Sequence, residues 1–161
     1  MTLAIVPGSF DPVTYGHLDI VRRASKLFDK VIVLAMVNEA KQTFFSPEER
    51  LMMLRESVKG MPGVAADFFS GMTYDYIRDH GVDVIVKGVR NPKDFEYEAQ
   101  IALFNQEHAP MAETMFFYAD PKLKGISSSA AKQAFAAGQD ITDKVPPIVL
   151  EMLRMKQEQL K

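Results

Sequence analysis

The sequence of 161 residues contains no cysteine. Disulfides, thiolate catalysis and zinc or iron–sulfur centres ligated by cysteine are therefore excluded. An excess of charge of one sign is also missing, since 19 Lys and Arg stand against 21 Asp and Glu, for a formal net charge of −2. Extended nucleic-acid binding needs a strongly basic surface, so we expect no nucleic-acid partner, and any anionic ligand must be held locally.

Long hydrophobic runs are absent as well. Runs such as residues 31–37 fall far short of the roughly 20 apolar residues of a membrane-spanning helix, and Met1-Thr2-Leu3 lacks the basic start of a secretory leader. We therefore expect no membrane contact and a cytoplasmic protein. With 47% hydrophobic and 25% charged residues, the composition is typical of one globular domain, which we expect over residues 1–161.

Five short apolar segments alternate with stretches of helical periodicity. The expected strands are residues 3–7, 31–37, 64–69, 82–87 and 114–119. Between the first two, Leu18, Val21, Ala24 and Phe28 recur at helical spacing, and further helices are expected to begin near residues 46, 73, 91, 127 and 146. This alternation predicts an α/β fold, a single Rossmann-like doubly wound domain with a five-stranded parallel sheet and helices on both faces.

The segment after the first expected strand has the composition of a phosphate cradle. Gly8 and Gly16 let a ligand approach the backbone, Ser9 and Thr14 offer hydroxyl donors, and His17 lies near a helix N-terminus, which attracts anions. In a doubly wound sheet, such a loop lies at the carboxyl edge, where ligands bind. For an isolated Gly-x-His motif, a tight turn with a surface histidine is the alternative.

Three motifs, in this order along the chain, resemble those of the nucleotidylyltransferase superfamily. Residues 8–12 and 14–17 (Gly-Ser-Phe-Asp-Pro and Thr-Tyr-Gly-His) resemble its His-x-Gly-His signature, with threonine in place of the first histidine. Residues 88–90 and 94–98 resemble its central block, and residues 126–129 with Lys132 resemble its Ile-Ser-Ser-Ser/Thr motif. The threonine variant is similar to that of phosphopantetheine adenylyltransferases, which are enzymes of coenzyme A synthesis.

The resemblance implies an enzyme that transfers the adenylyl group of ATP to 4′-phosphopantetheine and gives dephospho-coenzyme A and pyrophosphate. It implies three catalytic residues, His17, Lys41 and Arg90. The substrate-binding residues that it implies are Ser9, Lys41, Met72 and Lys87. The ATP-binding residues that it implies are Ser9, Phe10, His17, Gly88, Val89, Arg90, Glu98, Leu123, Lys124, Gly125, Ile126, Ser127, Ser128 and Ser129.

The positions of the cationic residues suit this chemistry. Adenylyl transfer brings two polyanions together, so catalysis consists largely of aligning them and stabilising the added negative charge. Lys41 follows the second expected strand, and Lys87 and Arg90 lie at or after the end of the fourth. All three are therefore expected at the edge of the sheet that carries His17.

Several of these residues also have a purely structural interpretation. Lys41 could be an ordinary solvated lysine, and Met72 could belong to the core. Asp94 and Glu98, four residues apart, could form an exposed acidic pair, which is the interpretation that we favour for Asp94. Lys87 departs from the family, which usually has Arg-Gly-x-Arg here. Lysine keeps the charge but lacks the planar fork of arginine, and we expect the site to tolerate it.

No pair of histidines has the spacing of metal ligands, so we expect no metal held by the protein and Mg²⁺ bound through the phosphates of ATP. The resemblance further implies a homohexamer and feedback inhibition by coenzyme A. Two other functions remain open. One is another nucleotidylyltransferase, such as one acting on nicotinate mononucleotide, against which Thr14 argues. The other is a non-catalytic nucleotide-binding domain, which would not need His17, Lys41 and Arg90 together.

Overall fold

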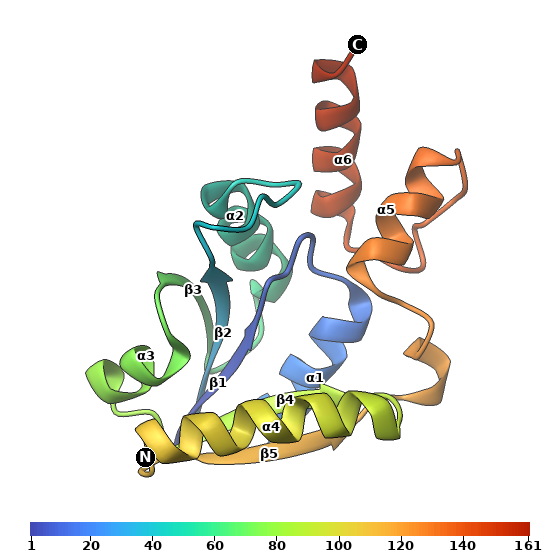
Figure 1. Ribbon diagram of the computed structural model, residues 1–161. Helices are drawn as coiled ribbons and strands as arrows, with labels where there is room; N and C mark the ends of the chain where they lie inside the picture. Colours follow the sequence, from blue (N-terminus) through green and yellow to red (C-terminus); the bar gives the residue numbers. More distant parts are fainter.

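A computed structural model describes all residues, 1–161, and a five-stranded sheet lies at its centre (Figure 1). The strands are β1 (Leu3–Gly8), β2 (Lys30–Val37), β3 (Val64–Ser70), β4 (Val84–Val89) and β5 (Glu113–Tyr118). They are all parallel and lie in the order β3-β2-β1-β4-β5. The expected Rossmann-like α/β fold is therefore confirmed.

Six α-helices follow or connect the strands, and one 3-10 turn, η1 (Pro121–Leu123), precedes the fifth. The helices are α1 (Tyr15–Ser25), α2 (Pro47–Val58), α3 (Thr73–His80), α4 (Pro92–His108), α5 (Ser128–Ala136) and α6 (Pro147–Gln159). Local sequence explains their ends, because Ser46 and Asn91 accept backbone N–H groups at the starts of α2 and α4, and Gly81 ends α3 with a φ of 65°. These residues serve the backbone groups that a helix leaves unpaired.

Two expected boundaries were wrong by a few residues. The helix expected to include Phe28 ends at Ser25, and Phe28 follows it in a turn whose N–H donates to the Ala24 carbonyl. The fourth strand begins at Val84 rather than at Val82, because the N–H of Val82 donates to the Ile77 carbonyl and so completes the end of α3. In both places, an apolar residue that the pattern assigned to a helix or a strand instead donates a backbone hydrogen bond in the turn that ends a helix.

The two faces of the sheet are covered by different helices. One face packs against α1, α2, α5 and α6 and forms a core of 23 buried residues, to which Ala4 and Val6 of β1 belong. The other packs against α3 and α4 and forms a core of nine buried residues, to which the intervening Ile5 belongs. This alternation along β1 is that of a strand covered on both sides, so the sheet is doubly wound as expected.

The order of the strands defines where a ligand can enter. The chain moves outward from β1 to β2 and β3 on one side, and then crosses to β4 and β5 on the other. The loops that leave the carboxyl ends of β1 and β4 therefore diverge, which opens a crevice in folds of this kind. Figure 1 shows α5 and α6 standing at this end of the sheet. None of the helices has the length and apolarity needed to cross a membrane.

Candidate active site

The loop after β1 folds back tightly on itself. Phe10 has a φ of 48°, and its buried ring lies so close to Gly8 that a Cβ there would come within 3.1 Å of the ring. The ring also meets His17 edge to face, with centroids 5.0 Å apart. Gly8 is therefore required for close packing in the loop, and Phe10 forms a wall of the His17 environment.

His17 lies in the first turn of α1 and takes part in the cap of that helix. The backbone N–H of Thr14 donates to Nδ1 of His17 at 3.0 Å, and the N–H of His17 reaches the Thr14 hydroxyl at 3.4 Å. Because Nδ1 accepts a hydrogen bond, the proton of the neutral ring lies on Nε2. Thr14 thus fixes both the orientation and the tautomer of His17, and leaves Nε2–H as a donor.

The environment of His17 favours its neutral form. Its pKa is lowered from 6.5 to about 4, first by burial, which disfavours the charged ring, and then by the positive charges of Arg90 and Lys87. At neutral pH, His17 is therefore an uncharged hydrogen-bond donor. Because β1 and β4 are neighbouring parallel strands, their carboxyl ends bring His17, Lys87 and Arg90 to one edge of the sheet, as the sequence predicted.

Each of the two cations from β4 and its following loop is paired with a carboxylate of α4. Nζ of Lys87 lies 3.2 Å from Oε2 of Glu98, and Nε of Arg90 donates to Oδ2 of Asp94 at 3.0 Å. The hydrogen bond from Arg90 holds the pKa of Asp94 below its usual value. The interpretation of Asp94 as part of an exposed acidic pair was wrong, because each carboxylate has a cation of its own across the loop.

The start of α5 lies against the start of α1. Ser127 caps α5 by accepting the N–H of Ala130, and the Ser128 hydroxyl donates to the Pro12 carbonyl at 2.7 Å. Gly16 lies close to this segment, since a Cβ there would be in van der Waals contact with the Ile126 carbonyl oxygen at 3.4 Å. Two helix N-termini therefore lie side by side at the carboxyl edge, an arrangement that favours phosphate.

Asp11 connects this edge to the loop after β2. Its two carboxylate oxygens accept the N–H groups of Phe44 and Phe45, each at 2.8 Å, and Nζ of Lys132 lies 3.5 Å from Oδ2. Sequence reasoning did not assign Asp11 a role. Its place beside Phe10 inside the loop motif was the only available signal, since its partners lie 33, 34 and 121 residues away along the chain.

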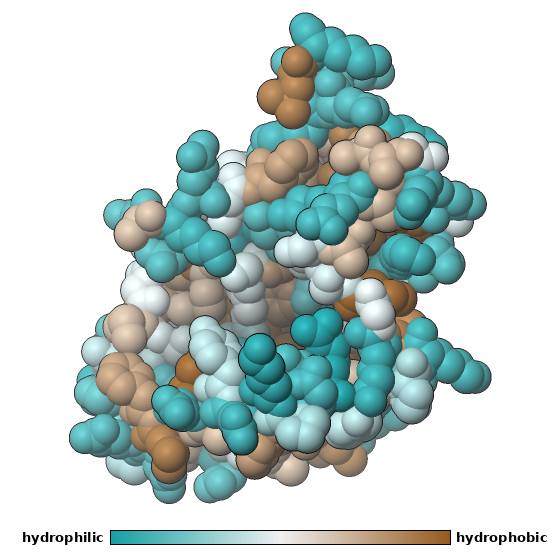
Figure 2. Space-filling view, turned by 45° about the vertical axis from the view of Figure 1, so that its right-hand side comes forward, coloured by the Kyte–Doolittle hydropathy of each residue, from teal (hydrophilic) through white to brown (hydrophobic).

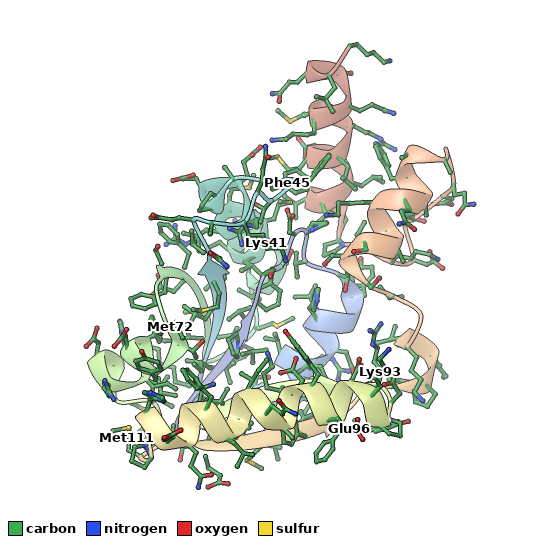
Figure 3. All side chains as sticks on the ribbon, viewed as in Figure 1. Lys41, Phe45, Met72, Lys93, Glu96 and Met111 are labelled. Carbon is green, nitrogen blue, oxygen red and sulfur yellow. The ribbon has the colours of Figure 1, made fainter.

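The remaining predicted residues surround the edge. Ser9 and Lys41 are both exposed, and Lys41 lies in the loop after β2 (Figure 3). None of the ion pairs of the structure includes Lys41. Met72 is 46% exposed, so the core interpretation was wrong. It lines a groove of about 360 Å³ between α3 and α4, together with Tyr97 and Asn105. Of the segment 123–129, Ser129 is exposed at the start of α5, and Lys124 donates to the Tyr118 hydroxyl at 2.7 Å.

Figure 2 shows a hollow near the middle of one face of the molecule, between the part that carries α5 and α6 and the part that carries α4. The charged residues at the end of β4 and directly after it, Lys87 and Arg90, are basic, and their carboxylate partners belong to α4. No group of three His, Asp or Glu residues is placed to hold a metal ion. The donors at this edge therefore suit phosphate oxygens better than a bare divalent cation.

Comparison with known proteins gives the class of the chain. Residues 5–134, which contain the loop after β1, the end of β4 and the start of α5, match the cytidylyltransferase-like family. The chain belongs to this family, as the motifs of the nucleotidylyltransferase superfamily predicted.

Curated relatives narrow the assignment. The chain is 45% identical to the phosphopantetheine adenylyltransferase of Caldanaerobacter subterraneus over 156 residues, which are 97% of this chain and 98% of that protein. It is 46% identical to that of Dictyoglomus thermophilum and 47% identical to that of Dictyoglomus turgidum, over 95% and 98% of those proteins. The resemblance to phosphopantetheine adenylyltransferases is therefore confirmed, whereas the roles of the individual site residues stay predictions.

Proposed function

We propose that the chain transfers the adenylyl group of ATP to 4′-phosphopantetheine. An oxygen of the acceptor's phosphate forms a bond with the α-phosphorus of ATP, and the bond from that phosphorus to the bridging oxygen breaks. Pyrophosphate leaves with the electron pair, and dephospho-coenzyme A remains. No covalent bond to the protein is needed, so the protein contributes alignment and charge stabilisation.

The observation that carries this proposal is the hydrogen bond from the Thr14 N–H to Nδ1 of His17, which leaves Nε2–H as a donor at the edge where β1 and β4 end. A neutral donor stabilises the negative charge that develops on the α-phosphate without having to lose or gain a proton. Lys41, from the loop after β2, and Arg90, after β4, supply positive charge to the reacting phosphates. The adjacent starts of α1 and α5 receive the phosphates of ATP.

The ion pairs with α4 give the cations a second function in the proposal. Lys87 and Arg90 are held by Glu98 and Asp94 in the absence of substrate, and they exchange these carboxylates for phosphate oxygens when substrate binds. Mg²⁺ enters as part of the MgATP substrate, because the basic edge offers phosphate donors rather than a set of carboxylate ligands.

The discriminating experiment incubates the protein with MgATP and either 4′-phosphopantetheine or nicotinate mononucleotide, and follows the release of pyrophosphate. We expect release only with 4′-phosphopantetheine, in equal amount with dephospho-coenzyme A. The His17→Ala variant is the matched control for contaminating activity. Release of pyrophosphate with nicotinate mononucleotide instead would show that the chain is another nucleotidylyltransferase. Binding of ATP without any release of pyrophosphate would show that it is a non-catalytic nucleotide-binding domain.

We also propose assembly into a homohexamer in the cytoplasm, where ATP is supplied, with feedback inhibition by coenzyme A. Large apolar side chains on α4 support the assembly, since Tyr97 and Leu103 are 69% and 66% exposed. Coenzyme A carries the pantetheine arm and adenine nucleotide of the product, so it can occupy the same edge.

The assembly is tested by light scattering after gel filtration. Leu103→Glu is expected to reduce the particle size, whereas Leu27→Glu, at a side chain 65% exposed beyond α1, leaves it unchanged. A Leu103→Glu variant of unaltered size contradicts an interface on α4.

A further inference from the structure

Arg50 is a buried cation without a carboxylate partner. It lies in the first turn of α2 and is only 2% exposed. Its Nη1 donates to the carbonyls of Ser9, at 2.7 Å, and Met36, at 3.1 Å, while its Nε has no hydrogen-bond partner. None of the nine ion pairs of the structure includes it.

This arrangement is costly for the folded chain without a ligand. Arginine is almost never fully buried unless an opposite charge neutralises it. The N-terminal turn of a helix is also the end at which the helix dipole disfavours a cation. The acid next to it does not compensate, because Glu49 accepts the N–H of Ser46 and pairs with Lys156. The hydrogen-bond partners of the guanidinium are therefore two neutral carbonyl groups, those of Ser9 and Met36.

The position of Arg50 shows where an opposite charge can come from. Ser9 follows β1 directly and Met36 lies near the end of β2, so the guanidinium connects the carboxyl ends of two neighbouring strands. Ser9 itself is exposed on the other side of this contact. A phosphate bound at the exposed Ser9 side chain would therefore lie beside the residue whose carbonyl accepts from Arg50, and the 2% exposed guanidinium is shielded from bulk water. Low polarity strengthens such an attraction.

We propose that Arg50 is a positioning residue for the phosphate of the acceptor. It fixes the backbone of Ser9 through the Ser9 carbonyl, and its unneutralised charge attracts the acceptor's phosphate across that residue. The bound phosphate is the opposite charge that the free protein lacks. This inference rests on the proposed adenylyl transfer, and it assigns to the buried face of α2 a part in recognition of the acceptor.

The test compares Arg50→Lys, which keeps the charge, with Arg50→Gln, which keeps a donor but removes the charge. We expect the KM for 4′-phosphopantetheine to rise by less than about fivefold in Arg50→Lys and by more than about fivefold in Arg50→Gln, with the KM for ATP changed less than that for the acceptor in both. Arg55→Gln is the matched control, because Arg55 is an exposed arginine of the same helix. Its KM values are expected to equal those of the wild type.

A second measurement separates recognition from structural damage. Saturating 4′-phosphopantetheine is expected to raise the Tm of the wild type and of Arg50→Lys by a similar amount, and to raise that of Arg50→Gln by less. Equal shifts in all three proteins, or a KM that rises more than fivefold in Arg50→Lys, overturn the inference. If Arg50→Gln does not fold, the result for Arg50→Lys alone decides. A wild type that releases no pyrophosphate contradicts the proposed function instead, so the two failures are distinct.

Discussion

The two faces of the sheet differ in how completely one chain covers them. The face under α1, α2, α5 and α6 buries 23 residues in one cluster, whereas the face under α3 and α4 buries nine. Large exposed apolar side chains are frequent on the second side, among them Phe95, Tyr97, Leu103 and Phe104 of α4. The first face therefore supplies most of the fold's stability, and the second retains surface for contacts outside the chain.

The same division applies to the site. The heavily packed side holds groups whose geometry is fixed, such as His17 with its locked tautomer and the capped start of α5. The α4 side holds charges in exchangeable pairs, Lys87 with Glu98 and Arg90 with Asp94. Rigid donors and releasable cations thus come from opposite faces and meet at the carboxyl edge.

The largest expected effect concerns the two cores. Leu54→Ala, in the larger cluster, is expected to lower the free energy of unfolding by about 4 kcal/mol, and Ile77→Ala, in the smaller one, by about 2 kcal/mol. Both side chains are fully buried, but Leu54 belongs to the cluster of 23 buried residues and Ile77 to the cluster of nine, so we expect the smaller cluster to close more easily around a cavity. Urea unfolding of the two variants measures this difference, and equal losses would show that the two cores are packed equally tightly.

Removal of His17 tests the fixed donor of the site without changing the ion pairs of α4. His17→Ala is expected to lower kcat by at least about 100-fold, the scale of one lost transition-state donor, while ATP still binds. The change removes a group from the start of α1 but leaves the ion pairs of α4 in place. Steady-state kinetics with a calorimetric measurement of ATP binding test this, and near wild-type turnover would falsify the role of His17.

The lowered pKa of His17 predicts a dependence of stability on pH. Because the ring has a pKa of about 4 in the folded chain and 6.5 in the unfolded one, the unfolded state binds more protons between these values. His17 therefore does not lower the free energy of unfolding above pH 6.5, and it lowers this free energy increasingly as the pH falls from 6.5 towards 4. Between pH 7 and 4.5, the wild type is expected to lose about 2 kcal/mol more than His17→Gln. Denaturant unfolding at both pH values measures this, and parallel losses would contradict a partly buried ring that stays neutral.

The smallest expected effect concerns the exchangeable side. Lys87→Arg is expected to change the KM for 4′-phosphopantetheine by less than about tenfold, or roughly 1.4 kcal/mol, whereas Lys87→Ala raises it by more. Either cation can leave Glu98 for a phosphate, while alanine leaves the Glu98 charge, 18% exposed, without its partner. If kinetics of the alanine variant match the wild type, Lys87 does not contact the acceptor.

Much of this arrangement is encoded locally. The bounds of α3, residues 73–80, follow from its periodicity and from Gly81, and the caps of α2 and α4 are visible in the sequence as Ser46 and Asn91. The chain order of the loop motifs also predicted that His17, Lys87 and Arg90 meet, because parallel strands bring their carboxyl ends to one edge.

What the sequence did not reveal depends on contacts between distant segments. Arg50 is a charged residue for which the sequence predicts exposure, and its burial follows from contacts with Ser9 and Met36, 41 and 14 residues away. The pairing of Lys87 of β4 with Glu98 of α4 likewise depends on how α4 packs beside β4, 11 residues further along the chain. Periodicity describes one element at a time and carries no information about such contacts.

The hydrogen bonds of Asp11 allow the opening of the site to be followed by amide hydrogen exchange. Its carboxylate holds the amide protons of Phe44 and Phe45, one on each oxygen, and the ammonium of Lys132 lies against the same group. We expect these two protons to exchange with deuterium when the loop that carries Lys41 separates from the loop after β1, since this separation breaks both hydrogen bonds. Their exchange rates therefore measure how often the edge comes apart, at two backbone positions and without any label attached to the site.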